Sequence, residues 1–325
     1  MRFIVYGVGA IGGTIAASLA LAGREVVGIA RGRMLDAIRK DGLRFRTPEG
    51  EHRVSFPCHA GPDEIAFRPD DVILLTMKSQ DTHEALLALR SAGVAEQAVI
   101  CSQNGVANER MALRVFPNVY GMTVMMPADY TVPGEVNCYG GPKYGIFDLG
   151  RYPGGADAAA EEIAEHLRAA NFAVFLLADV MHSKYGKLLS NLGNVLEAAL
   201  GPDSDRKALF GKVRAEAEAV YRAAGIAWMA VGLGTDDPRR EGMMEMRPVA
   251  GAPRFGGSST QSLQRGSPAI ETDYLNGEIV LLGRLHGVPT PVNAYLTRLG
   301  QRLIAEKLTP GAIDPAEIAA ALDAG

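Results

Sequence analysis

The chain has 325 residues, of which 47% are hydrophobic and 22% are charged, and its formal net charge is −4. This length suggests two domains that together bury a large core. Because there is no basic excess and only 6% of the residues are aromatic, the composition argues against a nucleic-acid-binding protein.

Neither a metal site nor a membrane segment is predicted. The three cysteines form no CxxC motif and the six histidines form no HxxxH pair, so we expect no structural metal and no disulfide scaffold. No run of 18 apolar residues occurs, and the N-terminus carries no leader pattern. We therefore expect a cytoplasmic protein that does not enter the membrane.

The N-terminal half alternates short apolar runs with amphipathic stretches. The expected strands span residues 2–6, 25–30, 71–76, 98–101 and 172–177, and the expected helices span 10–22, 82–89 and 156–170. Such alternation indicates βαβ units and a parallel sheet that is covered on both faces. Prolines and glycines interrupt residues 118–148, which predicts antiparallel strands that extend the sheet. The strand at 172–177 is expected to be the last one.

The C-terminal half has helical spacing and no convincing strand. The expected helices span residues 181–200, 208–224, 269–285 and 293–307, with a Pro/Gly-rich loop around 248–257. We therefore predict an α/β fold with a Rossmann-type, doubly wound domain over residues 1–179 and a mostly helical domain over 180–325.

A glycine-rich motif directly follows the first expected strand and opens the first helix. It consists of Gly7, Val8, Gly9, Ala10, Ile11 and Gly12. In a GxGxxG turn the first glycine permits the tight geometry, the second lets a pyrophosphate approach the backbone, and the third allows close helix–strand packing. We expect this turn to bind a dinucleotide, the alternative being an ordinary βα turn.

The end of the second strand predicts which dinucleotide is bound. NAD-binding folds usually place a carboxylate there for the ribose 2′-hydroxyl, but this chain has Arg31 followed by Arg33. A guanidinium suits a 2′-phosphate, so NADP(H) is the expected cofactor. Alternatively, these are two solvated arginines.

Polar residues also follow two further strands. Lys78 comes after the strand at 71–76, and Asn104, followed by Gly105, comes after the strand at 98–101. Ligands of open α/β sheets bind at the carboxyl ends of strands, so we expect both residues to bind the cofactor. Asn-Gly is equally typical of a plain turn.

One helical stripe in the C-terminal half carries lysine and asparagine side chains. Lys184, Lys187, Asn191 and Asn194 fall within an arc of about 80° beside a leucine-rich face. They either bind a ligand or form a solvated helix edge, and Lys184 is expected at the solvated end.

A serine pair and an acidic stretch complete the candidate residues. Ser259 lies 12 residues before Glu271, which we expect to start a buried helix. A buried carboxylate needs a partner, for which Lys187 is the natural candidate. Alternatively, Glu271 and Asp273 stabilise the helix dipole.

Taken together and in this order, these motifs resemble the ketopantoate reductase (2-dehydropantoate 2-reductase) family over essentially the whole chain. The resemblance implies a Rossmann domain followed by a helical domain like that of 6-phosphogluconate dehydrogenase. It also implies that Lys187 donates the proton, that Asn191 and Ser259 hold the substrate, that Asn104 lies between cofactor and substrate, and that Glu271 supports Lys187 and the nicotinamide ribose.

The sequence departs from the family pattern on the substrate side. The asparagine usually found eight residues after the lysine is Val195 here, with Asn194 one position earlier, and a usual aspartate is Leu263. The resemblance therefore implies NADPH-dependent reduction of a 2-oxo acid, with 2-dehydropantoate on the pantothenate route to coenzyme A as the expected substrate. Another 2-oxo acid, or a noncatalytic NADP-binding sensor or scaffold, is the alternative, and a homodimer is one option for assembly.

Overall fold

The computed structural model describes residues 1–231 and 237–323, and the chain forms two compact units. The first unit comprises Met1–Gln103, Asn108–Lys184 and Ala230–Arg254. The second comprises Asn104–Ala107, Tyr185–Met229 and Phe255–Gly325. The described residues 230–231 and 237–254 thus group with the first unit, whereas the expected division at 179/180 placed them in the second.

An eight-stranded sheet forms the centre of the first unit, in the order β13-β12-β8-β7-β6-β1-β2-β5. Its strands are β1 (Arg2–Tyr6), β2 (Glu25–Ile29), β5 (Cys58–His59), β6 (Asp71–Leu75), β7 (Ala98–Cys101), β8 (Val119–Met125), β12 (Ile146–Arg151) and β13 (Ala173–Leu176). All neighbours are parallel except β8 and β12. This arrangement confirms the predicted doubly wound sheet.

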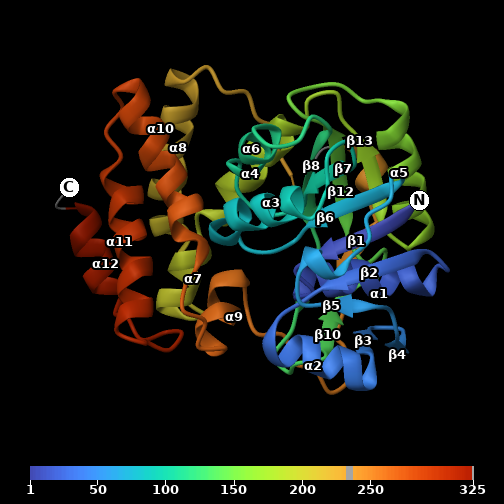
Figure 1. The fold of residues 1–325 in the computed structure, drawn as a ribbon. Coiled ribbons are helices and arrows are strands. Elements are labelled where there is room, and N and C mark those ends of the chain that lie inside the picture. The colour runs from blue at the N-terminus through green and yellow to red at the C-terminus, as the bar shows by residue number, and fades with distance from the viewer. Residues whose placement is uncertain (232–236, 324–325) are drawn as a thin grey trace. The chain divides into compact units, whose positions relative to one another are not determined.

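Helices cover both faces of this sheet because successive side chains of a buried strand point to opposite sides. Phe3 and Val5 pack with residues of α1 (Ala10–Leu21) and α5 (Ala158–Ala169). Ile4, between them, packs with residues of α3 (Thr82–Ser91) and α4 (Asn108–Leu113) on the other face (Figure 1). The continuous apolar runs of these strands follow from burial on both sides.

The segment 118–148 supplies more than an extension of the main sheet. A second sheet has the order β4-β3-β10-β9 and is accompanied by α2 (Gly32–Asp41). Its strands are β3 (Leu43–Thr47), β4 (Gly50–Val54), β9 (Ala128–Asp129) and β10 (Glu135–Cys138). Only β8 and β12 of this segment meet the expectation of an antiparallel extension.

The strand at 173–176 is not the last one, contrary to the prediction. β14 (Met244–Met246) pairs antiparallel with β11 (Gly140–Pro142). Nearby, the buried guanidinium of Arg240 lies 2.5 Å from the buried carboxylate of Asp148 on β12. This strand pairing and ion pair attach residues 240–246 to the first unit.

The second unit is helical, and no strand occurs among its described residues (Figure 1). Its helices are α6 (Val180–Asn191, which begins in the first unit), α7 (Asn194–Leu200), α8 (Lys207–Ala223), α9 (Ser258–Gln264), α10 (Asn276–His286), α11 (Pro291–Ala305) and α12 (Pro315–Asp323). α10 and α11 pack on each other and on α8. The predicted mostly helical C-terminal domain is therefore confirmed as a fold class.

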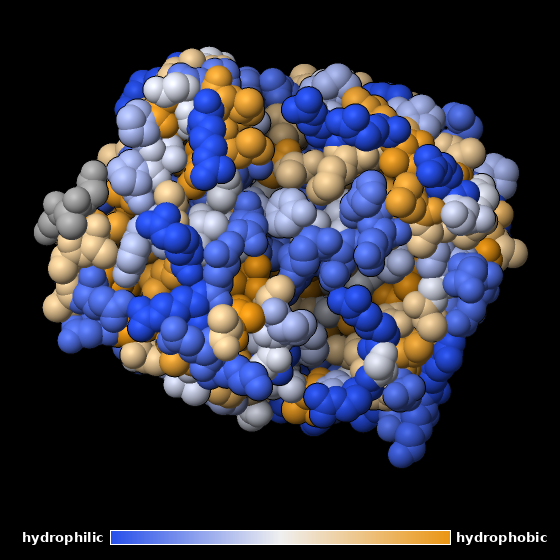
Figure 2. All heavy atoms as spheres, turned by 60° about the vertical axis from the view of Figure 1, so that its left-hand side comes forward, coloured by the Kyte–Doolittle hydropathy of each residue, from blue (hydrophilic) through white to orange (hydrophobic). Residues whose placement is uncertain are grey.

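The surface mixes hydrophilic and hydrophobic side chains over the face that Figure 2 shows. Among the large apolar side chains that are exposed, Leu281 and Leu285 lie one turn apart on α10. Within the described part of the chain, no helix is both long and apolar enough to span a lipid bilayer.

Candidate active site

The glycine-rich loop between β1 and α1 is shaped by close packing on the end of β6. Gly7 has φ +107°, and a Cβ there would lie 2.7 Å from the backbone nitrogen of Met77. A Cβ on Gly12 would collide with the Gly7 carbonyl and with Oγ1 of Thr76. The same hydroxyl donates to the carbonyl of Gly7 at 2.9 Å. Both positions therefore require glycine for the loop to close.

The start of α1 leaves backbone N–H groups without a side-chain partner. No side chain caps this helix at Gly9, and no acidic residue occupies its first turn. A Cβ on Gly9 would make only an ordinary contact of 3.5 Å with the ring of Tyr130, so the protein's own packing does not demand glycine there. An uncapped helix N-terminus behind small residues fits the pyrophosphate of a dinucleotide. Val8, in the same loop, packs in the core.

Arg31 has a partner that the sequence did not indicate. Its side chain is 84% exposed, and its guanidinium lies 2.9 Å from the carboxylate of Asp81. Asp81 ends the 3₁₀ turn η2 (Ser79–Asp81), which follows Lys78 at the end of β6. The fold therefore brings a carboxylate to a strand end that has none in its local sequence, because β2 and β6 both neighbour β1. Arg33 is exposed on α2.

The loop Asn104–Ala107 belongs to the second unit. Gly105 has φ +79°, and a Cβ on it would lie 3.0 Å from the carbonyl oxygen of Tyr274. Tyr274 ends the 3₁₀ turn η4 (Glu271–Tyr274). Asn104 and Gly105 thus do form a turn. Gly105, which follows Asn104 directly, packs on the 3₁₀ turn that contains Glu271.

Lys187 and Asn191 lie one helical turn apart on α6 and therefore on one face. Lys187 is partly buried, and desolvation lowers the pKa of its ammonium. Asn191 is 7% exposed, and its amide oxygen accepts no hydrogen bond within the described structure. A desolvated proton donor beside an unsatisfied amide oxygen is an arrangement that suits a polar ligand.

The predicted single stripe from Lys184 to Asn194 is wrong, because the helix breaks after Asn191. The carbonyl of Leu192 accepts a hydrogen bond from the Asn276 side chain at 3.2 Å, and α7 starts at Asn194. Val195, at the position of the family's second asparagine, is 1% exposed and belongs to the core. Asn194 is partly exposed at the first position of its own helix.

Lys184 is also not at a solvated end. Its side chain is 2% exposed, and its ammonium lies 2.7 Å from the carboxylate of Glu109, which is 0% exposed. The prediction failed because Glu109 is 75 residues distant in sequence. Lys184 is therefore ion-paired in the first unit, whereas Lys187 belongs to the second.

Ser259 lies in the first turn of α9 and is 4% exposed. The carboxylate of Glu197, on α7, accepts hydrogen bonds from the backbone N–H of Gly257 and from Oγ1 of Thr260. Arg206 donates to the other oxygen of Glu197 at 3.1 Å. Sequence reasoning missed Glu197, although it holds the start of the helix that carries Ser259.

Glu271 is 7% exposed and opens a 3₁₀ turn, with the α-helix beginning only at Asn276. The expected helix thus starts at Glu271 as a 3₁₀ turn and becomes α-helical only at Asn276. Desolvation lowers the pKa of Lys187, and the expected ion pair between Lys187 and Glu271 stays a prediction. Thr272 fixes the turn by packing on Gly300 of α11.

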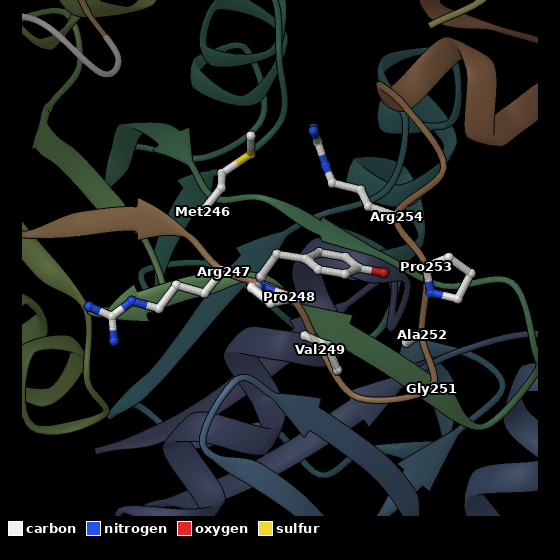
Figure 3. A pocket seen from close by; sticks show the side chains of 9 residues that line it. Met246, Arg247, Pro248, Val249, Gly251, Ala252, Pro253 and Arg254 are labelled. Carbon is white, nitrogen blue, oxygen red and sulfur yellow. The ribbon is translucent and has the colours of Figure 1, made fainter. Parts of the chain in front are cut away.

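A pocket of about 550 Å³ lies elsewhere in the first unit (Figure 3). It is lined by Tyr139 and by residues of the 246–254 segment, including Arg254. The Tyr139 hydroxyl donates to the buried carboxylate of Asp129 at 2.8 Å, and burial together with that carboxylate raises the pKa of Tyr139. The tyrosine therefore stays neutral, and none of the site residues predicted from the sequence lines this pocket. No metal-binding cluster occurs among the residues that the structure describes.

Comparison with known proteins matches both halves of the chain. The family model described as Ketopantoate reductase PanE/ApbA covers residues 3–154, and the one described as Ketopantoate reductase PanE/ApbA C terminal covers residues 179–303. The 2-dehydropantoate 2-reductase of Halobacterium salinarum is 30% identical over 312 residues, which are 93% of this chain and 99% of that protein.

Solved structures share the fold. The PanE/ApbA family ketopantoate reductase from Ralstonia eutropha JMP134 is similar with a TM-score of 0.76 and 27% identity, covering 94% of this chain and 99% of that one. D-mandelate dehydrogenase, solved with NADH and anilino(oxo)acetate, has a TM-score of 0.74 at 20% identity, with the same two coverages. The second likeness is one of fold alone.

Proposed function

The chain belongs to the ketopantoate reductase family, and from that premise we propose that it reduces 2-dehydropantoate to pantoate with NADPH. It is an oxidoreductase that takes a nicotinamide cofactor and a small-molecule substrate. The observation that carries the proposal is the pair on α6: a desolvated Lys187 ammonium beside the unsatisfied amide oxygen of Asn191.

Lys187 is the proposed general acid. When bound, the nicotinamide supplies the hydride that reduces the C2 carbonyl. Negative charge then develops on the carbonyl oxygen, and Nζ of Lys187 donates its proton there. Desolvation lowers the pKa of Lys187, which makes the ammonium a stronger acid than an ordinary lysine.

The remaining second-unit residues hold the substrate. Asn191 and Ser259 orient the carboxylate and hydroxyl of the 2-oxo acid, and Asn194 lies at the start of the next helix. Asn104 lies where cofactor and substrate meet. Glu271 supports the nicotinamide ribose and orients Lys187 once ligands are bound.

The first-unit residues hold the cofactor. The loop from Gly7 to Gly12 cradles the pyrophosphate, and Lys78 binds at the end of β6. Arg31 binds the 2′-phosphate of NADPH, since an exposed guanidinium offers bidentate, charge-assisted hydrogen bonds. Asp81 competes for the same guanidinium, so NADPH must displace this carboxylate or share Arg31 with it.

The reaction would place the chain in the cytoplasm, on the pantothenate route to coenzyme A. An alternative substrate is favoured by one specific observation. The family's second asparagine is replaced by a core valine, Val195, and the usual aspartate by Leu263, so the pocket differs on the substrate side. A related 2-oxo acid reductase is therefore the second candidate. A noncatalytic NADP sensor would have no use for the desolvated Lys187.

Steady-state turnover tests the proposal. We expect NADPH oxidation with 2-dehydropantoate to give the highest kcat/KM in a panel that also contains pyruvate and a second branched 2-oxo acid. If 2-dehydropantoate is reduced no faster than pyruvate, the pantothenate assignment fails and the reductase assignment survives. If no 2-oxo acid is reduced while NADPH still binds, the sensor replaces the enzyme.

A further inference from the structure

The chain passes between the two units at Gln103 and again at Lys184, and these two residues contact each other. Nζ of Lys184 donates to the carbonyl oxygen of Gln103 at 2.7 Å. It lies 3.5 Å from the carbonyl oxygen of Cys101 and 2.7 Å from Oε1 of Glu109. One buried ammonium therefore joins the end of β7, the start of α4 and the start of α6. All four residues lie within the first unit.

The charge of the buried Glu109 carboxylate is compensated by the Lys184 ammonium. Apart from the ion pair, neither of its carboxylate oxygens accepts a well-formed hydrogen bond from any residue that the structure describes. Gly121 of β8 lies beside this side chain, and a Cβ there would make an ordinary contact of 3.5 Å with Cγ of Glu109. A buried carboxylate without Lys184 would be uncompensated.

Both ends of the loop Asn104–Ala107 are fixed by buried side chains. Nε2 of Gln103 donates to Oγ1 of Thr82 at 3.0 Å, and Thr82 donates to Oδ1 of Asn108 at 2.8 Å. Nδ2 of Asn108 donates to Oγ of Ser79 at 3.0 Å. Gln103 and Asn108, which flank the loop, thus belong to one network of buried hydrogen bonds. Lys184 is bonded to Gln103 and so to this network.

We propose that Lys184 is a positioning residue: its bond to the Gln103 carbonyl fixes the loop of Asn104 to the helix that carries Lys187. Lys187 follows Lys184 by three residues, which is about 4.5 Å along a helix axis. Asn104 follows Gln103 directly. The inference rests on the proposed function for the roles of Lys187 and Asn104, whereas the contacts of Lys184 do not depend on it.

A merely structural role would not require this ion pair. Two well-packed apolar side chains can replace a buried ion pair without loss of stability. They cannot donate to the Gln103 carbonyl. If Lys184 serves only the core, an apolar pair would restore both folding and activity. If it positions catalytic groups, such a pair would restore folding alone.

The test is the double variant Lys184→Met with Glu109→Met in the full chain, assayed with NADPH and 2-dehydropantoate. We expect a melting temperature near that of the wild type, a kcat at least about tenfold lower, and a KM for NADPH within about twofold, because Arg31 and the glycine loop are untouched. Displacement of a catalytic group by about 1 Å is enough for such a loss. A kcat within about twofold of wild type would overturn the proposal.

Glu109→Gln is the matched control. It removes the carboxylate charge but keeps the Lys184 ammonium and its bond to Gln103, so we expect kcat within about threefold of the wild type. A loss in this variant as large as in the double variant would mean that charge at position 109, and not the bond to Gln103, controls kcat, and would overturn the assignment.

Hydrogen exchange separates this proposal from the proposed function, since it needs no turnover. In the wild type, the amides of residues 105–107 and 185–188 should exchange slowly, and in the double variant faster than in the wild type at matched global stability. Rapid exchange of these amides in the wild type would overturn the proposal even if the double variant does not fold. If the wild type reduces no 2-oxo acid, the proposed function fails while this result still decides whether Lys184 fixes the loop and the helix.

Discussion

Two lysines that lie one turn apart on α6 have opposite environments. Lys184 is buried 2.7 Å from the carboxylate of Glu109, so its charge is compensated and its geometry is fixed. Lys187, one turn later, is desolvated, which lowers its pKa. An ion-paired ammonium serves structure, whereas a desolvated one with a lowered pKa can release its proton.

The largest effect is expected from replacing Lys187, the second of the two lysines. Lys187→Met keeps most of the side-chain length but removes the proton and the charge. We expect kcat to fall by about 10²–10⁴-fold with little change in the NADPH dissociation constant. The melting temperature should stay the same or rise, because a desolvated charge is removed. A nearly normal kcat would show that another group is the acid.

The same substitution at the first lysine should instead cost stability. Lys184→Met leaves Glu109 buried without a counter-charge, which we expect to lower the free energy of unfolding by about 3–5 kcal/mol. Urea denaturation measures this loss, and the added Glu109→Met change should recover most of it. A loss below about 1 kcal/mol would mean that water reaches the pair and that the contrast between the two lysines is weaker than the structure indicates.

Arg31, unlike Lys184, forms an ion pair that is exposed to solvent, and its partner is Asp81. Arg31→Ala should remove a charge-assisted contact to the 2′-phosphate and weaken NADPH binding by about 1.5–3 kcal/mol, while NADH binding changes little. Dissociation constants for both cofactors measure it. Equal use of NADH and NADPH by the wild type would contradict the assigned role of Arg31.

The smallest expected effect concerns Asp81, the ion-pair partner of Arg31. Asp81→Asn releases the Arg31 guanidinium from a solvent-exposed ion pair, whose worth is about 0–1 kcal/mol. NADPH should therefore bind up to about fivefold more tightly, with NADH unchanged. An unchanged ratio of the two dissociation constants would show that Asp81 does not compete with the 2′-phosphate.

Local sequence patterns predicted the first half of the fold well. The strand β1, the glycine loop and the helix α1 follow one another within 20 residues, and their signals are the spacing of apolar residues and three glycines, of which the packing requires Gly7 and Gly12. The same holds for β6, α3 and β7, whose bounds differ from the predicted ones by no more than about two residues.

The failures share one cause, which is dependence on a distant residue. β14 forms only because β11, about 100 residues earlier, offers an edge to pair with. The break between α6 and α7 is held by Asn276. The burial of Lys184 depends on Glu109, and the ion pair of Arg31 depends on Asp81. No periodicity within a window of the sequence carries such information.

The pH dependence of turnover tests the central claim most directly. A general acid must carry its proton, so kcat should fall as the pH rises through the pKa of Lys187, which lies below the ordinary value of 10.5 because of desolvation. We predict that this alkaline decline persists in the variant with Lys184→Met and Glu109→Met and disappears from the residual activity of Lys187→Met. An alkaline decline that is unchanged in Lys187→Met would contradict the account.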